Sequence, residues 1–213
     1  MIWSILVATL ARRSDLLARV MSDLAPQMPP GGVEVVAYRN HGEIPLCDIR
    51  QALVEDAHGD YLCFVDDDDR LPPYYVDMVL PLLDGTVDYV GWRMQAYVHG
   101  QPLKPTYHTL DAGGWWETDQ AYYRDVSHLN PVRTELARCC DFRRGVVPED
   151  VSWSDQMRTY VKTQHLCGDQ IMYHYYATTD STWHPGHEPA WDGTAEPLPD
   201  YGWGWFRWHG AST

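Results

Sequence analysis

Four short apolar runs alternate with amphipathic segments over the first ninety residues, and this alternation limits the folds open to the chain. The runs are short, largely apolar and bounded by polar or turn residues, as expected of buried strands, and they cover residues 2–8, 33–38, 61–65 and 87–92. The segments between them repeat apolar residues at helical spacing, from Ser14 toward Pro26, over 48–57 and over 73–83. This order predicts an α/β fold with a mostly parallel central sheet.

The second half of the chain is less regular. Residues 93–125 alternate polar and apolar side chains between glycine turns, which predicts hairpins. Short helices are expected over 130–140 and from Ser152 through Val161, followed by a strand over 165–176. Five of the ten tryptophans lie beyond residue 182, in a stretch also rich in Pro and Gly, which predicts an irregular tail that wraps a single domain. Packing is the expected role of these rings, although aromatic rings also stack on sugars.

The charge and the cysteines exclude several classes of protein. Sixteen basic residues against thirty acidic ones give a net charge of −14, which argues against a broad nucleic-acid footprint. A local basic patch stays open at Arg138, Arg143 and Arg144. The five cysteines have no metal-binding spacing, so free thiols in a reducing compartment are expected.

No apolar run is long enough to cross a bilayer, and the N-terminus has no basic leader. We therefore expect no transmembrane segment and a cytoplasmic location, which means the host cytoplasm if a phage encodes the protein.

Four consecutive aspartates, which we call the acidic run, carry the strongest chemical signal: Asp66, Asp67, Asp68 and Asp69. They follow an apolar strand directly, at the edge where ligands bind to parallel sheets. Their mutual repulsion is costly unless a cation compensates it, and carboxylate oxygens suit Mg²⁺ or Mn²⁺. Such a metal would bridge diphosphate oxygens. The alternative is a solvated acidic turn before the next helix, which one or two aspartates would fit better than four.

In this setting the sequence resembles the GT-A-fold glycosyltransferases, in particular the large inverting family 2. Residues 4–13 are similar to the first strand and turn of that family, with Ala8 where the family often has proline. Residues 49–53 resemble its Arg-Asn-Ala-Leu helix, and residues 58–69 resemble its Gly-Glu-Tyr strand leading into the Asp-X-Asp signature. The similarity is clear over residues 2–83 and patchy over 125–176. Small stand-alone members of this fold occur in bacteria and phages.

The resemblance implies roles for the residues around the first three strands. Asp66 would contact the ribose or the water shell of the metal, and Asp68 would bind the metal, with Asp67 as the alternative because the run allows a shift by one. Three further residues would line the nucleotide: Thr9, Arg12 and Arg50. The acidic residue that usually follows the second strand has no match, since Tyr38-Arg39-Asn40 stands there. The identity of the base is therefore open, although a UDP-sugar is the expected donor.

Residues implied downstream belong to the acceptor side. Inverting transfer needs a general base for the acceptor hydroxyl. By resemblance that base is Asp150, with Glu149 beside it and Asp155 as the second choice; His128 and Trp153 would lie near the acceptor. A later histidine often completes the metal site in this fold, which leaves His174, His184 and His187 as candidates. A helix-terminal charge pair at residues 149–150, or packed histidines, would explain the same residues without chemistry.

The sequence thus predicts a single GT-A (Rossmann-like) domain over 1–213, with a nucleotide-sugar half (1–92), an acceptor half (93–178) and a tail (179–213). It would use Mn²⁺ or Mg²⁺ to move a sugar from a nucleotide-sugar to an acceptor hydroxyl, with inversion. The acceptor stays open among a glycan, a protein and a modified nucleic acid. One alternative is a non-catalytic sugar-binding module on the same scaffold. Another is a nucleotidyl or phosphoryl transferase, which the absence of a Gly-Lys phosphate loop disfavours.

Overall fold

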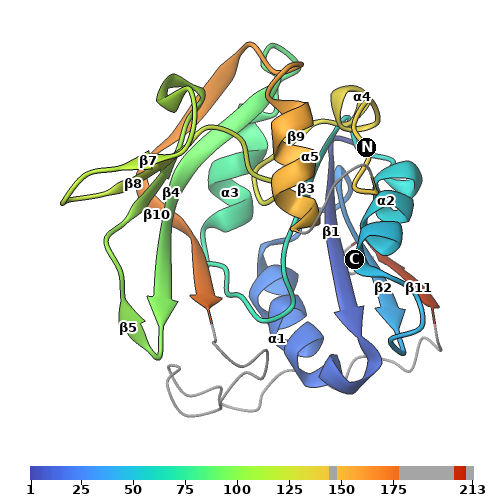
Figure 1. Cartoon of the computed structure of the whole chain (residues 1–213). Helices are drawn as coiled ribbons and strands as arrows, with labels where there is room; N and C mark the ends of the chain where they lie inside the picture. Colours follow the sequence, from blue (N-terminus) through green and yellow to red (C-terminus); the bar gives the residue numbers. More distant parts are fainter. Residues whose placement is uncertain (144–147, 178–203, 210–213) are drawn as a thin grey trace.

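The computed structural model describes residues 1–143, 148–177 and 204–209. A mixed sheet runs through this part of the chain, with helices on both of its faces (Figure 1). The strand order is β11-β2-β1-β3-β9-β4-β6-β8-β7, and β5 and β10 also pair with β4. The strands are β1 Trp3–Leu10, β2 Val33–Asn40, β3 Tyr61–Phe64, β4 Tyr89–Val98, β5 Gln101–Pro102, β6 Thr106–His108, β7 Trp116–Glu117, β8 Tyr122–Arg124, β9 Val132–Arg133, β10 Gln164–Ala177 and β11 Gly204–Trp208.

The helices are short and connect or cover the strands. The α-helices are α1 Ser14–Leu24, α2 Leu46–Asp56, α3 Tyr75–Val79, α4 Thr134–Ala137 and α5 Glu149–Met157. Turns of 3-10 helix are η1 Ala11–Arg13, η2 Ala25–Gln27, η3 Leu80–Leu82 and η4 Leu110–Ala112. The helix predicted over 73–83 tightens after α3, because Pro81 has no N–H to continue the α-helical ladder. No helix in the described ranges is long and apolar enough to cross a membrane.

The first half of the chain confirms the predicted strand–helix alternation. Strand β1 lies between β2 and β3 and runs parallel to both. This arrangement brings the carboxyl ends of β1 and β2, together with the loop after β3, to one edge of the sheet. The three strands are almost entirely buried, which explains why they read as continuous apolar runs.

The prediction of a mostly parallel sheet is wrong, because the second half of the chain adds antiparallel pairs. Strand β9 runs antiparallel to both β3 and β4, and β5 and β6 run antiparallel to β4. The β4–β5 turn places His99 at φ 50° and Gly100 at φ 73°. Positive φ at both central residues is typical of the two-residue turns that fit a hairpin. Tight turns therefore reverse the chain where longer helical crossovers would keep strands parallel.

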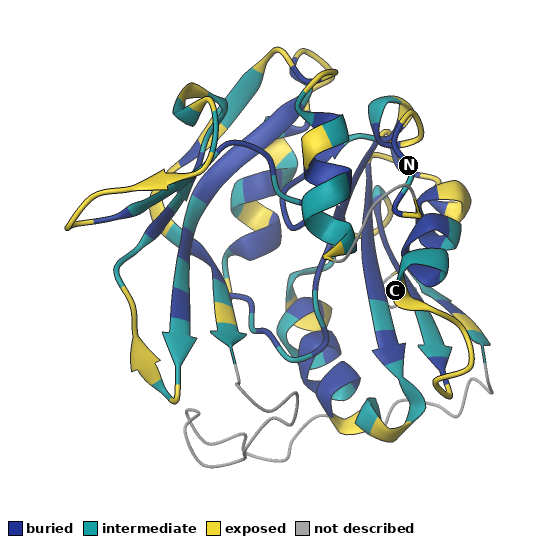
Figure 2. Ribbon diagram, in the orientation of Figure 1, coloured by how far each residue is buried: buried dark blue, intermediate teal, exposed yellow. Residues whose placement is uncertain are grey.

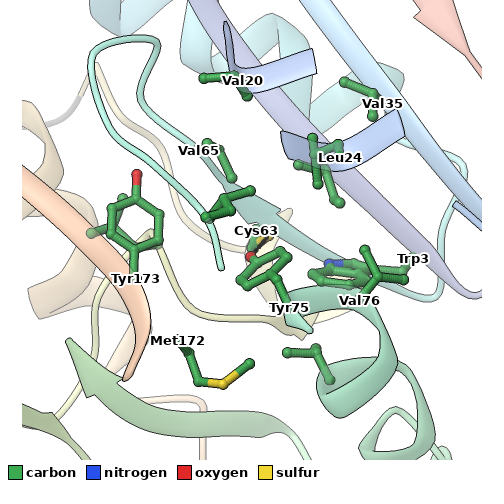
Figure 3. Packing of buried hydrophobic residues seen from close by; sticks show 14 of the residues in the cluster. Trp3, Val20, Leu24, Val35, Cys63, Val65, Tyr75, Val76, Met172 and Tyr173 are labelled. Atoms are coloured by element: carbon green, nitrogen blue, oxygen red, sulfur yellow. Dashed lines mark hydrogen bonds between the residues drawn. The ribbon is translucent and has the colours of Figure 1, made fainter. Parts of the chain in front are cut away.

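Two buried clusters hold the helices to the sheet (Figure 2). The first joins the α1 and α3 side, where the ring of Tyr75 lies 5.4 Å from that of Trp3 (Figure 3). The Tyr75 ring also lies 5.6 Å from that of Trp92. The second joins the α2 and α5 side, where Trp153 stacks on Phe142 at 5.1 Å. The residues that position the site therefore stand on a rigid, closely packed frame.

The C-terminal strand β11 runs antiparallel to β2 and covers its outer edge. Arg207 of this strand pairs with Glu34 of β2, which is fully buried, and with Asp56 at the end of α2. Residues 204–208 of the predicted irregular tail are thus a regular strand, and residues 178–203 lie outside the described part.

Candidate active site

A cavity of about 360 Å³ opens at the edge where β1 and β2 end. It is lined by the end of β1, the loop after β2, the start of α2 and the acidic run: Ala8, Thr9, Leu10, Arg13, Asn40, Gly42, Ile44, Leu46, Ile49, Arg50, Asp66, Asp67 and Asp68. Ligands of α/β sheets bind at such an edge. The lining combines apolar side chains, among them Ile44 and Leu46, with the charged groups of Arg13, Arg50 and the acidic run.

Two arginines and a threonine bind the carboxylates of the acidic run. Arg50 contacts Asp66 at 2.9 Å, and Arg13 contacts both Asp67 at 2.8 Å and Asp68 at 2.6 Å. The Thr9 hydroxyl donates to the second oxygen of Asp67 at 2.6 Å. The guanidinium groups therefore offset much of the repulsion between neighbouring carboxylates.

Asp69 turns away from the cavity into the protein. Its side chain is 1% exposed and accepts the backbone N–H of Tyr176 at 2.8 Å. Burial, with the charges of Asp66 and Asp68, raises the pKa of Asp69 well above its ordinary value. Asp69 thus anchors β10 to the acidic run and faces no ligand.

The carboxyls of Asp66 and Asp67 differ in acidity. Burial alone raises the pKa of Asp66, but the proximity of Arg50 and His128 outweighs this effect and lowers the pKa below its ordinary value. Burial raises the pKa of Asp67 to about 7, against the opposing effects of Thr9 and Arg13. At neutral pH the run consequently holds an ionised Asp66 and a partly protonated Asp67.

The start of α5 brings a second pair of carboxylates to the acidic run. Glu149 contacts Arg50 at 3.0 Å, so Arg50 joins α5 to Asp66. Asp150 is about one-third exposed, and its Oδ2 lies 3.8 Å from Nδ1 of His128. The other ring nitrogen of His128 lies 3.7 Å from Oδ2 of Asp66. His128, which is 6% exposed, therefore stands between the acidic run and Asp150.

Several predicted site residues lie elsewhere. Arg12 is exposed and does not line the cavity, whereas its neighbour Arg13 does. Asp155 is exposed and pairs with Arg158 of the same helical region at 2.9 Å. Trp153 is fully buried against Phe142, where no acceptor can reach its ring.

The backbone of His174 pairs with Arg70, the residue after the acidic run, and its ring contacts Tyr97. Its backbone exchanges two hydrogen bonds with Arg70, at 3.0 and 3.1 Å, while Nδ1 lies 3.2 Å from the Tyr97 hydroxyl. The neighbouring side chains of β10 face the run: the Tyr173 hydroxyl accepts the N–H of Asp66 at 3.0 Å. Burial and the nearby carboxylates raise the pKa of Tyr175 to about 12. His184 and His187 lie outside the described residues.

Sequence reasoning placed Arg13 at this edge of the sheet without giving it a role, and it missed Tyr173 and Tyr175. The two tyrosines could have been predicted from the strand pattern, because residues 173 and 175 lie on one side of a strand and His174 lies on the other. The choice between Arg12 and Arg13 depends on the 3-10 turn η1, which the apolar pattern does not reveal.

The acidic run can supply a metal with only part of its ligands. Within residues 1–143, 148–177 and 204–209, no group of three or more His, Cys, Asp or Glu side chains converges as a metal site. Asp68 is 29% exposed and faces the cavity, with one oxygen on Arg13 and the other without a partner in the described part of the chain. The chemistry of this donor fits a hard cation whose remaining ligands come from phosphate and water.

Comparisons with known proteins bear on the fold. No protein-family model matches the sequence, and neither does any curated protein. The crystal structure of S. aureus TarS 1–349 is similar, with a TM-score of 0.64 and 16% identity over 83% of this chain and 60% of that one. The chain has a glycosyltransferase-like fold. The same TarS fragment has been solved with UDP-GlcNAc (TM-score 0.63, 17% identity, 86% and 60% covered) and with UDP (0.56, 16%, 84% and 60%).

These likenesses support an α/β fold shared with TarS, and they limit what else follows. The chain spans about 60% of the length of the TarS fragment, at 16% identity. The fold is therefore shared, whereas donor, acceptor and membership of family 2 stay predictions for this chain.

Proposed function

We propose that the protein is a glycosyltransferase that binds a UDP-sugar in the cavity and transfers the sugar to an acceptor hydroxyl with inversion. The observation that carries the proposal is the convergence of two motifs far apart in sequence. The acidic run and the start of α5 meet through Arg50, which contacts Asp66 at 2.9 Å and Glu149 at 3.0 Å. A fold similar to TarS, which has been solved with UDP-GlcNAc and UDP, supports this donor class.

The apolar and the charged side chains that line the cavity suit the base and the diphosphate of a nucleotide-sugar, respectively. Ile44 and Leu46 are large apolar side chains that are 39% and 45% exposed, and both line the cavity. They offer a flat base the apolar contact that it needs. Arg13 and Arg50 also line the cavity and can take phosphate oxygens, because a guanidinium presents paired donors to them. A divalent cation held by Asp68 would, when bound, neutralise charge on the departing diphosphate.

Asp150 acts as the general base in this proposal. It is accessible to solvent and faces the same region as Asp66, through His128. A carboxylate there accepts the proton of the acceptor hydroxyl as that hydroxyl attacks the anomeric carbon. Arg50 fixes the position of the helix that carries Asp150 relative to the acidic run, because it contacts both Glu149 and Asp66.

Thermal unfolding with nucleotides tests the donor site. UDP and UDP-GlcNAc, with Mn²⁺ or Mg²⁺, should raise the melting temperature of the wild type, since a ligand of the native state stabilises it by mass action. The rise should be much smaller in Asp68→Ala. No shift with any nucleotide diphosphate would overturn the proposal.

Release of UDP from UDP-GlcNAc, with water taking the sugar in place of the acceptor hydroxyl, tests the chemistry separately. Asp150→Asn should keep the nucleotide-induced shift but lose UDP release, whereas Asp155→Asn, on the exposed side of the same helix, should retain both. If the wild type binds UDP but neither it nor any variant releases sugar, the protein is a binding module.

A further inference from the structure

A row of aromatic rings crosses the part of the sheet farthest from the cavity. Tyr107 of β6 pairs in register with Tyr123 of β8, which pairs in register with Trp116 of β7. We call these three residues the aromatic row. On its inner side the row begins at Arg93 of β4, whose register partner is Tyr107. Residues paired across strands lie on one face of the sheet, so the rings stand side by side.

The rings of the aromatic row are stacked and fixed. The Tyr107 and Tyr123 centroids lie 5.5 Å apart at 17°, and those of Tyr123 and Trp116 lie 4.0 Å apart at 14°. Arg93 covers the inner end, 5.5 Å from the Tyr107 centroid. The indole N–H of Trp116 donates to the carbonyl oxygen of Ala112 at 2.9 Å. The orientation of the outer ring is therefore set before any ligand arrives.

The outer end of the aromatic row is open. Strand β7 ends the sheet path, and the β7–β8 hairpin projects at one side of the molecule with much of its surface exposed (Figures 1 and 2). Trp116 is 46% exposed and its neighbour Trp115 is 47% exposed. Arg124 lies 4.8 Å above the Trp115 ring. Two large indoles thus meet solvent on one short hairpin, away from either buried cluster.

The aromatic row lies on the sheet face that carries α5. Tyr89 of β4 belongs to the buried cluster that includes Trp153 of α5. Side chains alternate along β4, and its burial alternates with them from residue 92 to residue 97. Arg93 therefore shares the face of Tyr89, and the residues paired with it across β6, β8 and β7 continue that face to the edge of the sheet.

We propose that the outer end of the aromatic row, at the open face of Trp116, forms a binding site for a glycan chain built of pyranose rings. A pyranose presents a flat face of C–H groups, which stacks on an exposed aromatic face. Trp115 lies on the other face of the hairpin, against Arg124, and takes no part in this site. This site is separate from the cavity, and binding there does not depend on sugar transfer.

Charge and geometry disfavour a nucleic acid at the aromatic row. The chain carries a net charge of −14, which repels a polyanion, and the pairing of Lys104 with Glu117 leaves no cationic stripe along β7. Bases of a single strand stack on separate ring faces. In the row the inner faces already cover one another, so only the outer end accepts a ring.

The exposed area disfavours a protein partner. An indole exposed at this fraction offers on the order of 100 Å², and two of them fall far short of the roughly 800 Å² per partner that a stable protein interface buries. The same area matches one or two sugar rings. The size of the apolar patch therefore fits a saccharide better than a second copy of the chain.

Titration of the full chain with neutral oligosaccharides tests this site. We would use cellohexaose, maltohexaose, xylohexaose and chitohexaose, which differ in linkage and substituents, and follow the indole N–H signals by NMR. At least one should shift the Trp116 signal in a saturable way. Trp116→Ala should weaken that binding about tenfold or more. Trp116→Leu, which keeps an apolar side chain on β7, is the second variant if Trp116→Ala unfolds.

Trp205→Ala is the matched control, because Trp205 is 45% exposed but lies on β11 at the opposite end of the sheet. It should change oligosaccharide binding less than about twofold. All variants should keep the UDP-induced rise in melting temperature. Absence of that rise in the wild type would contradict the proposed function and leave the inference about the aromatic row intact. Absence of oligosaccharide binding, equal loss in Trp205→Ala, tighter binding of oligo-dT, or dimerisation through Trp116 would each overturn this inference.

Discussion

At the scale of single residues, Arg13 and Arg12 give a test that a simple sequence pattern does not anticipate. Both follow β1, yet only Arg13 lines the cavity and contacts Asp67 and Asp68. We expect Arg13→Gln to weaken UDP binding about tenfold, since charge-assisted hydrogen bonds to phosphate are lost. Titration calorimetry measures this loss. Arg12→Gln is the matched control and should bind UDP as the wild type does; equal weakening in both variants would contradict the assignment.

His128 is the other residue whose position is informative. It is buried between Asp66 and Asp150, at 3.7 and 3.8 Å, and its Nε2 has no hydrogen-bond partner within the described residues. A side chain that only positions Asp150 should affect turnover more than donor binding. We expect His128→Gln to lower the rate of UDP release about tenfold or more while the Kd for UDP stays within about twofold. A change in Kd without a change in rate would place His128 in the donor site instead.

At the scale of secondary-structure elements, β11 depends on a buried charge. Glu34 is fully buried and receives the Ser4 hydroxyl, the His58 N–H and the Arg207 guanidinium. Removing one of these partners leaves the buried carboxylate with fewer groups to stabilise its negative charge. We expect Arg207→Met to reduce the free energy of unfolding by about 2 kcal/mol in urea denaturation. Arg143→Met, which removes a half-exposed cation paired with Asp141, should cost less than about 0.5 kcal/mol.

The pH dependence of that variant has a definite sign. Burial raises the pKa of Glu34, but Ser4, His58 and Arg207 outweigh burial and lower it. A lowered pKa in the folded state contributes stability above the unfolded pKa, and this contribution is lost as the pH falls. The difference between wild type and Arg207→Met should therefore be largest near neutral pH and shrink below about pH 4. A difference that stays constant with pH would show that Arg207 acts through packing alone.

The elements that sequence predicts well are those with local causes. Strands β1, β2 and β3 and helices α1 and α2 have bounds within a few residues of the apolar pattern, because each buries a continuous stretch. Strand β9 was missed inside a predicted helix over 130–140. Its two residues, Val132 and Arg133, are ordered by pairing with β3 and β4. Helix α5 begins at Glu149, three residues before the expected Ser152, so Asp150 lies in its first turn.

The same distinction applies to the candidate site. Asp66, Asp68, Arg50 and Asp150 could be selected from motif resemblance, because their sequence neighbours carry the signal. The roles of Arg13 and Tyr173 depend on contacts that span 55 and 107 positions of the chain. The aromatic row likewise depends on the pairing of β6, β8 and β7. Such contacts follow from strand order, which local patterns do not encode.

At the scale of the whole molecule, one sheet joins the cavity to the aromatic row. The cavity lies at the carboxyl ends of β1 and β2, and the row lies beyond β4 toward the last strand of the sheet. A glycan held at the row would extend along the face that also carries α5. A donor site and a separate saccharide site on one rigid sheet allow the two ligands to bind independently, so we expect neither to change the affinity for the other.

The acidic run also sets how the stability of the whole protein changes with pH. Burial raises the pKa of Asp67 to about 7, and the pKa of Asp69 is raised as well. A carboxyl whose pKa is higher in the folded state takes up a proton on folding, so stability increases as the pH falls through the folded pKa. For Asp67 alone, linkage gives an increase of about 1 kcal/mol in the free energy of unfolding from pH 8 to pH 6.

Replacing Asp67 with Asn should remove that increase, because the amide is neutral at every pH. Urea denaturation of wild type and Asp67→Asn at pH 8, 7 and 6 measures it, without nucleotide or metal. The free energy of unfolding of the variant minus that of the wild type should be larger at pH 8 than at pH 6. Comparing this difference at the two pH values cancels any constant cost of changing the contacts with Thr9 and Arg13. Parallel stability curves for the two proteins would show that Arg13 keeps Asp67 ionised. In that case the charge of the acidic run would be balanced by arginine alone.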